Sequence, residues 1–176
     1  MNTTLETERL LLRPLELPDT DAFLAVNSNP NVARYLRNPL KTMEESEMYI
    51  RKIISEYEQN GIGRFAAILK QTNRLIGFSG LKFRATEENG HSNFYDLGYR
   101  FAEEYWNMGL ATEAALAWLE YGFKEMELPT IHACAVADNI RSNKVLVKLG
   151  FQFTNQYLAN TEPHNWYKIE QQNVKK

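Results

Sequence analysis

The 176-residue sequence has little of several features that mark common protein classes. Cysteine occurs once, at position 134, so no disulfide can form within the chain, and this composition suits a reducing compartment. No apolar run approaches the roughly 20 residues of a membrane span, and the N-terminus lacks an apolar signal core. The net charge is −2, and no cationic run is longer than Lys175-Lys176. We therefore expect a cytoplasmic protein with neither a nucleic-acid partner nor a membrane partner.

Internal repeats, linkers and low-complexity tracts are also absent from the sequence. The length suits a single domain over residues 1–176, which is large enough to bury roughly two thirds of its unfolded surface. The polar residues 171–176 are expected to fray. We expect no metal site. The oligomeric state is left open, and a homodimer is one arrangement that the sequence allows.

Apolar periodicity and turn residues divide the chain into alternating elements. They predict strands over 10–15, 65–69, 75–83, 94–101, 131–136, 151–158 and 166–169, and helices over 22–26, 43–59, 110–126 and 140–149. Strands come first, followed by strand-helix-strand-helix-strands. This order predicts an α/β fold in which a mixed sheet carries helices on both faces.

One segment, from Leu97 to Ala114, reads as a strand that passes through a short turn into a helix. The first N–H groups of a helix lack partners within it and carry roughly half a positive charge, so they can hold an anion without a cationic side chain. Gly109 and Ala111 keep the approach to the backbone open. The segment therefore predicts a pyrophosphate site.

Two common phosphate-binding motifs do not fit this turn. The nucleotide-hydrolase loop needs Gly-Lys followed by Ser or Thr, and the dinucleotide fingerprint needs three glycines, whereas this turn has only Gly109. The turn resembles instead the acetyl-CoA pyrophosphate loop of the GNAT N-acetyltransferases, which reads Gln/Arg, two residues, Gly, one residue, Gly/Ala. Trp106, Gly109 and Ala111 occupy these positions, and Trp106 departs from the usual Gln or Arg.

Two further segments extend the resemblance over nearly the whole chain. Asn139 to Phe151 is similar to the later motif of the same family, which has Asn, two residues, Ser/Ala and a helix ending in Leu-Gly-Phe. The opening Thr-Glu-Arg-Leu-Leu-Leu-Arg-Pro, Thr7 to Pro14, also matches. Tyr-Trp before the glycine turn and Ala-Thr-Glu-Ala after it resemble the ribosomal-protein N-terminal acetyltransferase branch, the RimJ/RimL type.

The resemblance implies a GNAT fold, with a mostly antiparallel sheet whose central strands 94–101 and 131–136 splay apart. It also implies acetyl-CoA as cofactor, with its pantetheine between those strands and hydrogen-bonded like an extra strand to the backbone of Leu97, Tyr99 and Phe101. The residues expected to bind the cofactor are Leu97, Tyr99, Phe101, Trp106, Asn107, Met108, Gly109, Leu110, Ala111, Thr112, Asn139 and Asn143.

The reaction implied is acetyl transfer to a primary amine by direct attack in a ternary complex. An α-amine has a pKa of about 7.7–8.0 and is partly neutral at cytosolic pH. A lysine amine, with a pKa of about 10.4, is almost fully protonated there. The leaving thiol, with a pKa of about 8.5, needs little help. An α-amine acceptor therefore does not require a strong general base, and positioning of the reactants together with stabilisation of the oxyanion should supply most of the rate acceleration.

Two residues are expected to be catalytic. Many family members have a tyrosine acid where this chain has Leu146, so the resemblance assigns the thiol leaving group to Ser142. The alternative is that Ser142 only bonds a backbone carbonyl. Asn139 is a helix cap, worth about 1 kcal/mol, that by resemblance also contacts the pantetheine or a water molecule.

Two other titratable residues were considered for a catalytic role, one as a general base and one as a nucleophile. Asp96 is a candidate general base, but water-relayed deprotonation without a dedicated base is the preferred reading. Cys134 has no adjacent cation to lower its pKa, so we interpret it as a small buried side chain rather than a nucleophile.

By resemblance and position, the residues expected to line the acceptor site are Tyr35, Phe78 and Trp166. Segments 29–44 and 156–164 should select the acceptor, but they contain no readable code. The leading hypothesis is acetylation of a protein or peptide N-terminal α-amine. A small amine (polyamine, amino sugar or antibiotic) is the alternative, and a non-catalytic acyl-CoA-binding regulator is the third hypothesis. Acidic residues around the acceptor would favour a polycation.

Overall fold

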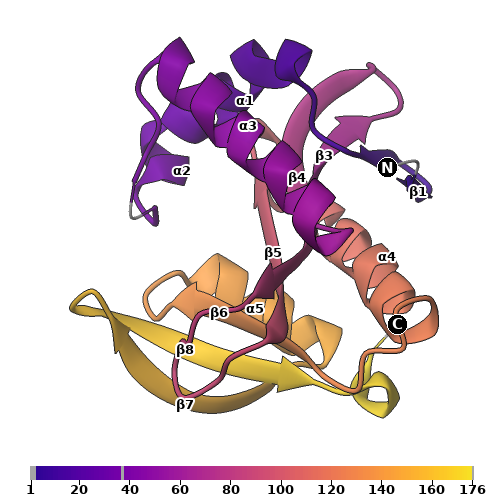
Figure 1. Cartoon of the computed structure of the whole chain (residues 1–176), viewed down its shortest axis with the longest axis vertical. Coiled ribbons are helices and arrows are strands. Elements are labelled where there is room, and N and C mark those ends of the chain that lie inside the picture. Colours follow the sequence, from indigo (N-terminus) through magenta and orange to yellow (C-terminus); the bar gives the residue numbers. More distant parts are fainter. Residues whose placement is uncertain (1–2, 37, 176) are drawn as a thin grey trace.

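An eight-stranded sheet forms the frame of the molecule in the computed structural model, which describes residues 3–36 and 38–175. The strands lie in the order β1-β2-β3-β4-β5-β6-β8-β7, and among them only the β5–β6 pair is parallel (Figure 1). This confirms the predicted mixed, mostly antiparallel sheet. The strands are β1 (Leu5–Glu6), β2 (Leu10–Arg13), β3 (Arg64–Leu69), β4 (Arg74–Arg84), β5 (Phe94–Phe101), β6 (Ile131–Val136), β7 (Gln152–Ala159) and β8 (Glu162–Ile169).

Five α-helices connect these strands in the described part of the chain. They are α1 (Thr20–Ser28), α2 (Pro30–Ala33), α3 (Met43–Asn60), α4 (Leu110–Lys124) and α5 (Ile140–Leu149). Helix α3 begins with a capping box, in which Thr42 and Glu45 exchange hydrogen bonds, and ends at Gly61 in the left-handed conformation. No described helix has both the length and the apolarity that crossing a membrane requires.

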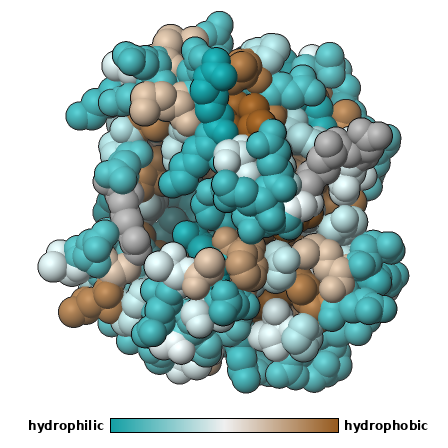
Figure 2. All heavy atoms as spheres, in the orientation of Figure 1, coloured by the Kyte–Doolittle hydropathy of each residue, from teal (hydrophilic) through white to brown (hydrophobic). Residues whose placement is uncertain are grey.

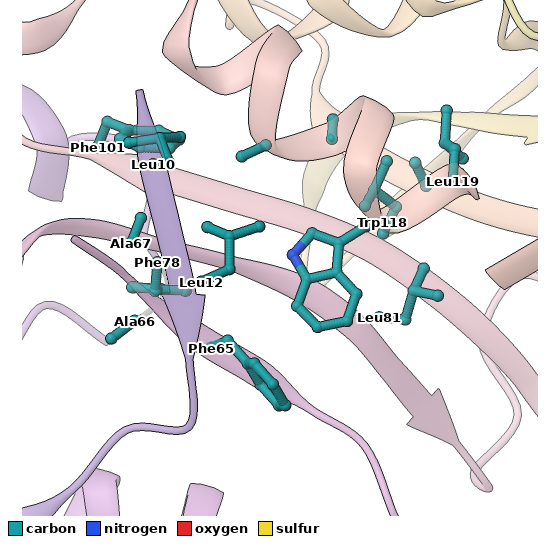
Figure 3. Packing of buried hydrophobic residues seen from close by; sticks show 14 of the residues in the cluster. Leu10, Leu12, Phe65, Ala66, Ala67, Phe78, Leu81, Phe101, Trp118 and Leu119 are labelled. Atoms are coloured by element: carbon teal, nitrogen blue, oxygen red, sulfur yellow. The ribbon is translucent and has the colours of Figure 1, made fainter. Parts of the chain in front are cut away.

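The helices cover both faces of the sheet because alternate strand residues point to opposite sides. On one face Phe65 of β3 meets Trp118 of α4 edge to face, with ring centroids 4.9 Å apart. Figure 3 shows Trp118 pointing from α4 toward Leu12 and Phe65 of the sheet. On the other face Phe78 of β4 stacks with Phe23 of α1 at 5.3 Å. These apolar contacts fix the two layers of helices on the sheet.

The central strands β5 and β6 part after a short contact. Asp96 and His132 are the one residue pair that joins them within the described residues. Beyond it the chain of β5 continues through Tyr99, while β6 turns to pair with β8 along its whole length. The predicted splayed pair is thereby confirmed.

The tail does not fray as the sequence suggested. Residues Gln171–Asn173 form a 3₁₀ turn, and the amide of Lys175 donates to the carbonyl of Leu149 at 3.0 Å. Gly150 makes this docking possible, since an added Cβ there would lie 1.9 Å from the Asn173 carbonyl oxygen. The tail therefore closes over the C-terminus of α5; the last residue, Lys176, lies outside the described residues.

Candidate active site

A cavity of about 720 Å³ lies where β5 and β6 separate. Its wall includes three consecutive β5 residues, Tyr99 to Phe101, and three consecutive β6 residues, Cys134 to Val136. Because consecutive strand residues point to opposite faces, the cavity reaches both sides of the sheet through the opening. Figure 2 shows the hollow at the left of the molecule, between the surface over α2 and the surface over α5. Two reactants can thus meet from opposite faces.

The loop before α4 borders one end of the cavity. Trp106 anchors this loop by donating its indole N–H to the Phe101 carbonyl at 2.8 Å. Asn107 (φ 61°) and Gly109 (φ 79°) both have left-handed backbone, which turns the chain sharply into the helix. Gly109 occupies the N-cap position, and no side chain among the described residues caps the helix. The first amides of α4 are therefore available for an anion.

The side of α5 that faces this end carries positive charge. Arg141, Lys144 and Lys148 line the cavity at a spacing of three and four residues, which places them on one side of the helix. The Arg141 guanidinium lies over the Trp106 ring, 5.0 Å from its centroid. Sequence reasoning missed these cations, although their helical spacing was a readable signal. Uncapped amides together with a cationic row fit the phosphates of coenzyme A.

Ser142 and Asn139 lie where the sequence analysis expected them, on the cavity wall. The Asn139 side chain accepts from the Ser142 amide at 3.2 Å, so Asn139 caps α5. The Tyr99 hydroxyl donates to the Ser142 carbonyl at 3.1 Å and lies 3.3 Å from Ser142 Oγ. Burial raises the pKa of the Tyr99 hydroxyl, which stays protonated at neutral pH. Two hydroxyls thus stand together beside the opening.

Asn143, which was expected to bind the cofactor, does not line the cavity. Its amide nitrogen donates to the carbonyls of Val136 at 3.0 Å and Asn139 at 2.8 Å. Its amide oxygen accepts from Asn165 at 2.9 Å and from the Tyr167 hydroxyl at 2.7 Å. With both ends of the amide engaged and the side chain off the cavity wall, Asn143 joins α5 to β6 and β8 instead.

The remaining expected cofactor residues divide into two groups. Those that line the cavity are Tyr99, Phe101, Trp106, Asn107, Gly109, Ala111, Thr112 and Asn139. Leu97 and Leu110 are each 2% exposed and belong to the apolar core, whereas the Met108 side chain points outward and is 52% exposed. These three side chains are therefore not part of the wall, because core packing or exposure to solvent takes them away from it.

Of the three residues expected at the acceptor, only Tyr35 lines the cavity. Phe78 is 5% exposed in the core against Phe23. Trp166 is 1% exposed and donates its indole N–H to His132 Nδ1 at 3.1 Å. Both aromatic rings are occupied by protein contacts, and neither lines the cavity. Residue 37, within the segment 29–44 expected to select the acceptor, lies outside the described residues.

Asp96 is not available as a general base. Arg64 and Arg84 each place a guanidinium nitrogen 2.8 Å from Asp96 Oδ2, and the carboxylate is 5% exposed. Both guanidinium groups bond the same carboxylate oxygen, so this oxygen is occupied within the protein. Asp96 also lies outside the cavity wall, so its function is to tie β3, β4 and β5 together.

Cys134 lines the cavity, which brings a thiol near the reaction. Burial raises its pKa to about 12, so the thiolate that a nucleophile requires is scarce at neutral pH. The raised pKa agrees with the interpretation that Cys134 is not a nucleophile, but the side chain is only partly buried instead of buried, because it borders the cavity.

Two further wall residues were not assigned by sequence reasoning. Arg100 of β5 and His164 of β8 both line the cavity. His164 is 7% exposed, and its Nδ1 lies 3.0 Å from the Glu162 carbonyl oxygen. Neither residue belongs to a sequence motif, and only the path of the strands brings them to the opening.

Comparisons with known proteins agree with this geometry. Residues 9–152 match the model of the "Acetyltransferase (GNAT) domain" family. An uncharacterised N-acetyltransferase, p20, from Bacillus licheniformis is 33% identical over 150 residues, which are 85% of this chain and 82% of the relative.

Two solved structures illustrate the likeness in fold. A GNAT-family acetyltransferase from Bacillus anthracis has a TM-score of 0.82 and 28% identity, covering 97% of this chain and 99% of that one. RimL, a ribosomal L7/L12 α-N-protein acetyltransferase in complex with coenzyme A, has a TM-score of 0.79 at 14% identity, covering 96% and 98%. The chain therefore belongs to the GNAT acetyltransferase family, whose members transfer an acetyl group from acetyl-CoA.

Proposed function

We propose that this enzyme acetylates the N-terminal α-amine of a protein or peptide in the cytoplasm, by direct attack within a ternary complex. The observation that supports an acceptor of this class is the charge of the cavity. Among the described residues, none that lines it is Asp or Glu, whereas Arg100, Arg141, Lys144 and Lys148 all do. The phosphates of coenzyme A would offset the three cations of α5, which leaves Arg100 and no carboxylate for the acceptor. Such a site lacks the acidic groups that would attract a polyamine or an aminoglycoside, while an α-amine that carries no further positive charge does not need them.

Acetyl-CoA, when bound, supplies an acetyl group already activated as a thioester. The protein's part begins with holding the phosphates, for which the uncapped amides at the start of α4 and the cations of α5 are suited. The opening between β5 and β6 then aligns the two reactants from opposite faces of the sheet. Positioning of this kind can account for a large part of the rate.

The hydroxyls of Ser142 and Tyr99 are the proton donors nearest the opening that the site offers. Because Tyr99 donates to the Ser142 carbonyl, the Ser142 hydroxyl is free to donate toward the cavity or to Tyr99. We assign to Ser142 the stabilisation of the departing thiol and to Tyr99 the orientation of Ser142. The α-amine loses its proton to water, because no described carboxylate faces the cavity.

The RimJ/RimL-type subdivision belongs to this proposal. It is supported by the Tyr-Trp and Ala-Thr-Glu-Ala motifs around Gly109. A ribosomal-protein-S5-alanine acetyltransferase from Vibrio fischeri, at 19% identity, shares the fold, which by itself does not carry its acceptor over to this chain.

The test is release of free thiol from acetyl-CoA with three panels of acceptors: peptides with free N-termini, polyamines and aminoglycosides. We expect peptides to be acetylated at the α-amine, as mass spectrometry of the product would show, and polycations to react slowly. Faster turnover of spermidine than of every peptide would contradict the proposed acceptor. Tight binding of acetyl-CoA without turnover of any amine would instead favour the regulator hypothesis.

A further inference from the structure

Arg100 places a positive charge on the acceptor side of the opening. Its neighbour Tyr99 points to the face of α5, where it meets Ser142, so Arg100 points to the opposite face, the one covered by α1. There its guanidinium bonds Asn27 of α1 and lies over the Phe78 ring, 4.8 Å from the centroid. Arg100 therefore lines the half of the cavity that the cofactor does not need.

Most of the hydrogen-bonding capacity of this guanidinium is unused by the protein. A guanidinium has five N–H donors, and Asn27 Oδ1 is the only acceptor found for Arg100 within residues 3–36 and 38–175. Arg64 and Arg84, which lie on the neighbouring strands β3 and β4, share a carboxylate, Asp96; Arg100 has none among the described residues. Burial, together with a smaller effect of the nearby Arg64 charge, lowers the pKa of Arg100 to about 10.

Burying a cation without an anion is unfavourable, and a bound carboxylate would relieve it. A carboxylate matches the planar guanidinium with two parallel hydrogen bonds. The position relative to the reaction is also informative. Since Arg100 follows Tyr99 directly in β5, an anion bound to it lies close to the amine that attacks at the opening.

We propose that Arg100 is a specificity-determining residue that binds a carboxylate of the acceptor, located only a few bonds from the reacting α-amine. This inference rests on the proposed acetylation of an α-amine. Two sources share the chemistry: the acidic side chain of an N-terminal Asp or Glu, and the α-carboxylate of a free amino acid. Tyr35, His164 and Cys134 line the same cavity and offer no competing anion.

The experiment compares acceptors that differ only in one charge. Peptides beginning with Asp or Glu are paired with identical peptides beginning with Asn or Gln, and free phenylalanine is paired with phenylalaninamide. We expect the wild-type kcat/KM to favour the carboxylate of at least one pair by about tenfold or more, as charge-assisted bonds of this kind do. The favoured pair identifies the source of the carboxylate.

Two variants and a control locate the preference. Arg100→Gln should bring the ratio within the pair close to one, and Arg100→Lys, which keeps the charge and loses the bidentate geometry, should give an intermediate ratio. Arg51→Gln, at an exposed arginine of α3 that pairs with Glu47, should keep the wild-type ratio. The melting temperature of each variant is measured alongside, because Arg100 also packs on Phe78.

A wild-type ratio near one in every pair would overturn the proposal, as would an unchanged ratio in folded Arg100→Gln. If no amine is acetylated although acetyl-CoA binds, the proposed function fails. Calorimetric titration of the same pairs into the wild-type protein with coenzyme A then decides about Arg100 separately. Tighter binding of the carboxylate member supports the proposal, and equal binding overturns it.

Discussion

Arg9 and Glu113 lie 104 residues apart in the sequence and are hydrogen-bonded to each other beside the loop that precedes α4. Arg9 donates to Glu113 from its backbone amide at 2.8 Å and from its Nε at 2.6 Å, and Thr7 Oγ1 adds a third bond at 2.5 Å. The Arg9 Nη1 also donates to the Met108 carbonyl at 2.8 Å. The N-terminal Thr-Glu-Arg-Leu motif thus holds the loop in place through the Ala-Thr-Glu-Ala motif.

Replacing Glu113 with Gln should loosen the loop without touching the reaction. We expect the Kd for acetyl-CoA to rise several-fold while kcat changes less, and stability to fall by about 1–3 kcal/mol, because three donors lose a charged acceptor. Calorimetric titration and thermal unfolding measure the two effects. Glu120→Gln, on the exposed side of the same helix, is the control. If both variants have the same Kd for acetyl-CoA, the Arg9–Glu113 hydrogen bonds do not hold the loop in its binding conformation.

The same carboxylate predicts a pH dependence. Burial raises the pKa of Glu113, but the bonds from Thr7 and Arg9 outweigh it and hold the pKa below the ordinary value of 4.5. Because the folded pKa is the lower one, the stabilisation is complete above pH 4.5 and is lost as the pH falls through the folded value. The difference in stability between wild type and Glu113→Gln should therefore shrink on acidification below about pH 4.5. A difference that stays constant down to pH 3 would contradict this.

Gly109→Val should abolish cofactor binding. The left-handed backbone at φ 79° disfavours a β-branched side chain, and the side chain would stand where the phosphate approaches the first amides of α4. Among the described residues an added Cβ meets only the Arg9 guanidinium, at 3.5 Å, so the fold itself has room. Titration with acetyl-CoA measures the loss.

Gly61→Val is the matched control for this change. Gly61 has nearly the same backbone, φ 69°, ends α3 away from the cavity and has nothing within 4 Å of an added Cβ. Both variants should therefore lose stability from the same backbone strain, and only Gly109→Val should lose affinity. Equal affinity in the two would show that the phosphate does not bind at the loop.

Ser142→Ala is expected to lower kcat by about tenfold or more, since a positioned proton donor is removed, and to leave the affinity for coenzyme A nearly unchanged. Tyr99→Phe should reduce kcat through the orientation of Ser142. If the two hydroxyls act as one unit, the double variant is no slower than Ser142→Ala alone. Steady-state kinetics of the four proteins checks this, and an unaltered rate in Ser142→Ala would remove its role in thiol departure.

Cys134→Ala should keep nearly full turnover, because a thiol whose pKa is about 12 supplies little thiolate at neutral pH. Alkylation of wild-type Cys134 by iodoacetamide should accordingly be slow at pH 7 and faster as the pH rises. An acetylated cysteine trapped by rapid acid quench, together with loss of activity in the alanine variant, would show a covalent pathway instead.

Asp96→Asn separates structure from proton transfer. Removing the carboxylate leaves the guanidinium groups of Arg64 and Arg84 without their shared partner, and we expect a loss of about 3–5 kcal/mol of stability. At a temperature where the variant is folded, the pH profile of kcat/KM should keep its midpoint. A midpoint that disappears with the carboxylate would restore Asp96 as the base.

Local patterns predicted the elements around the site very closely. Strands 94–101 and 131–136 and helix 140–149 have the predicted bounds, because apolar runs and caps such as Asn139 and Gly150 act over a few residues. The loop at Gly109 was readable for the same reason, since its chemistry resides in backbone conformation and helix-end amides.

Local sequence patterns did not predict which side chains contact one another across the sheet. Asn143 stands one residue after Ser142, yet four groups from β6, α5 and β8 occupy its amide. Phe78 and Trp166 are aromatic residues of the kind that often line binding sites, but both are packed in the core of this protein. The alternation of a strand tells which residues share a face, but it does not tell which helix covers that face.

By itself the amino-acid sequence determined the order of the main elements, the bounds of those around the site, the glycine turn before α4 and the family, because each depends on neighbours within a few residues or on motif spacing. It did not predict β1 or α2, and it began the last strand at 166 instead of 162. Tertiary structure alone decided that Arg9 bonds the loop before α4, that Asp96 is ion-paired and that Arg100 faces the side of the sheet covered by α1. The contacts of Arg9 and Asp96 join segments that are far apart in the sequence, which local patterns do not pair. The side that Arg100 faces matters because β5 and β6 share a single pair of residues, while β6 pairs with β8, a strand formed by the last part of the chain.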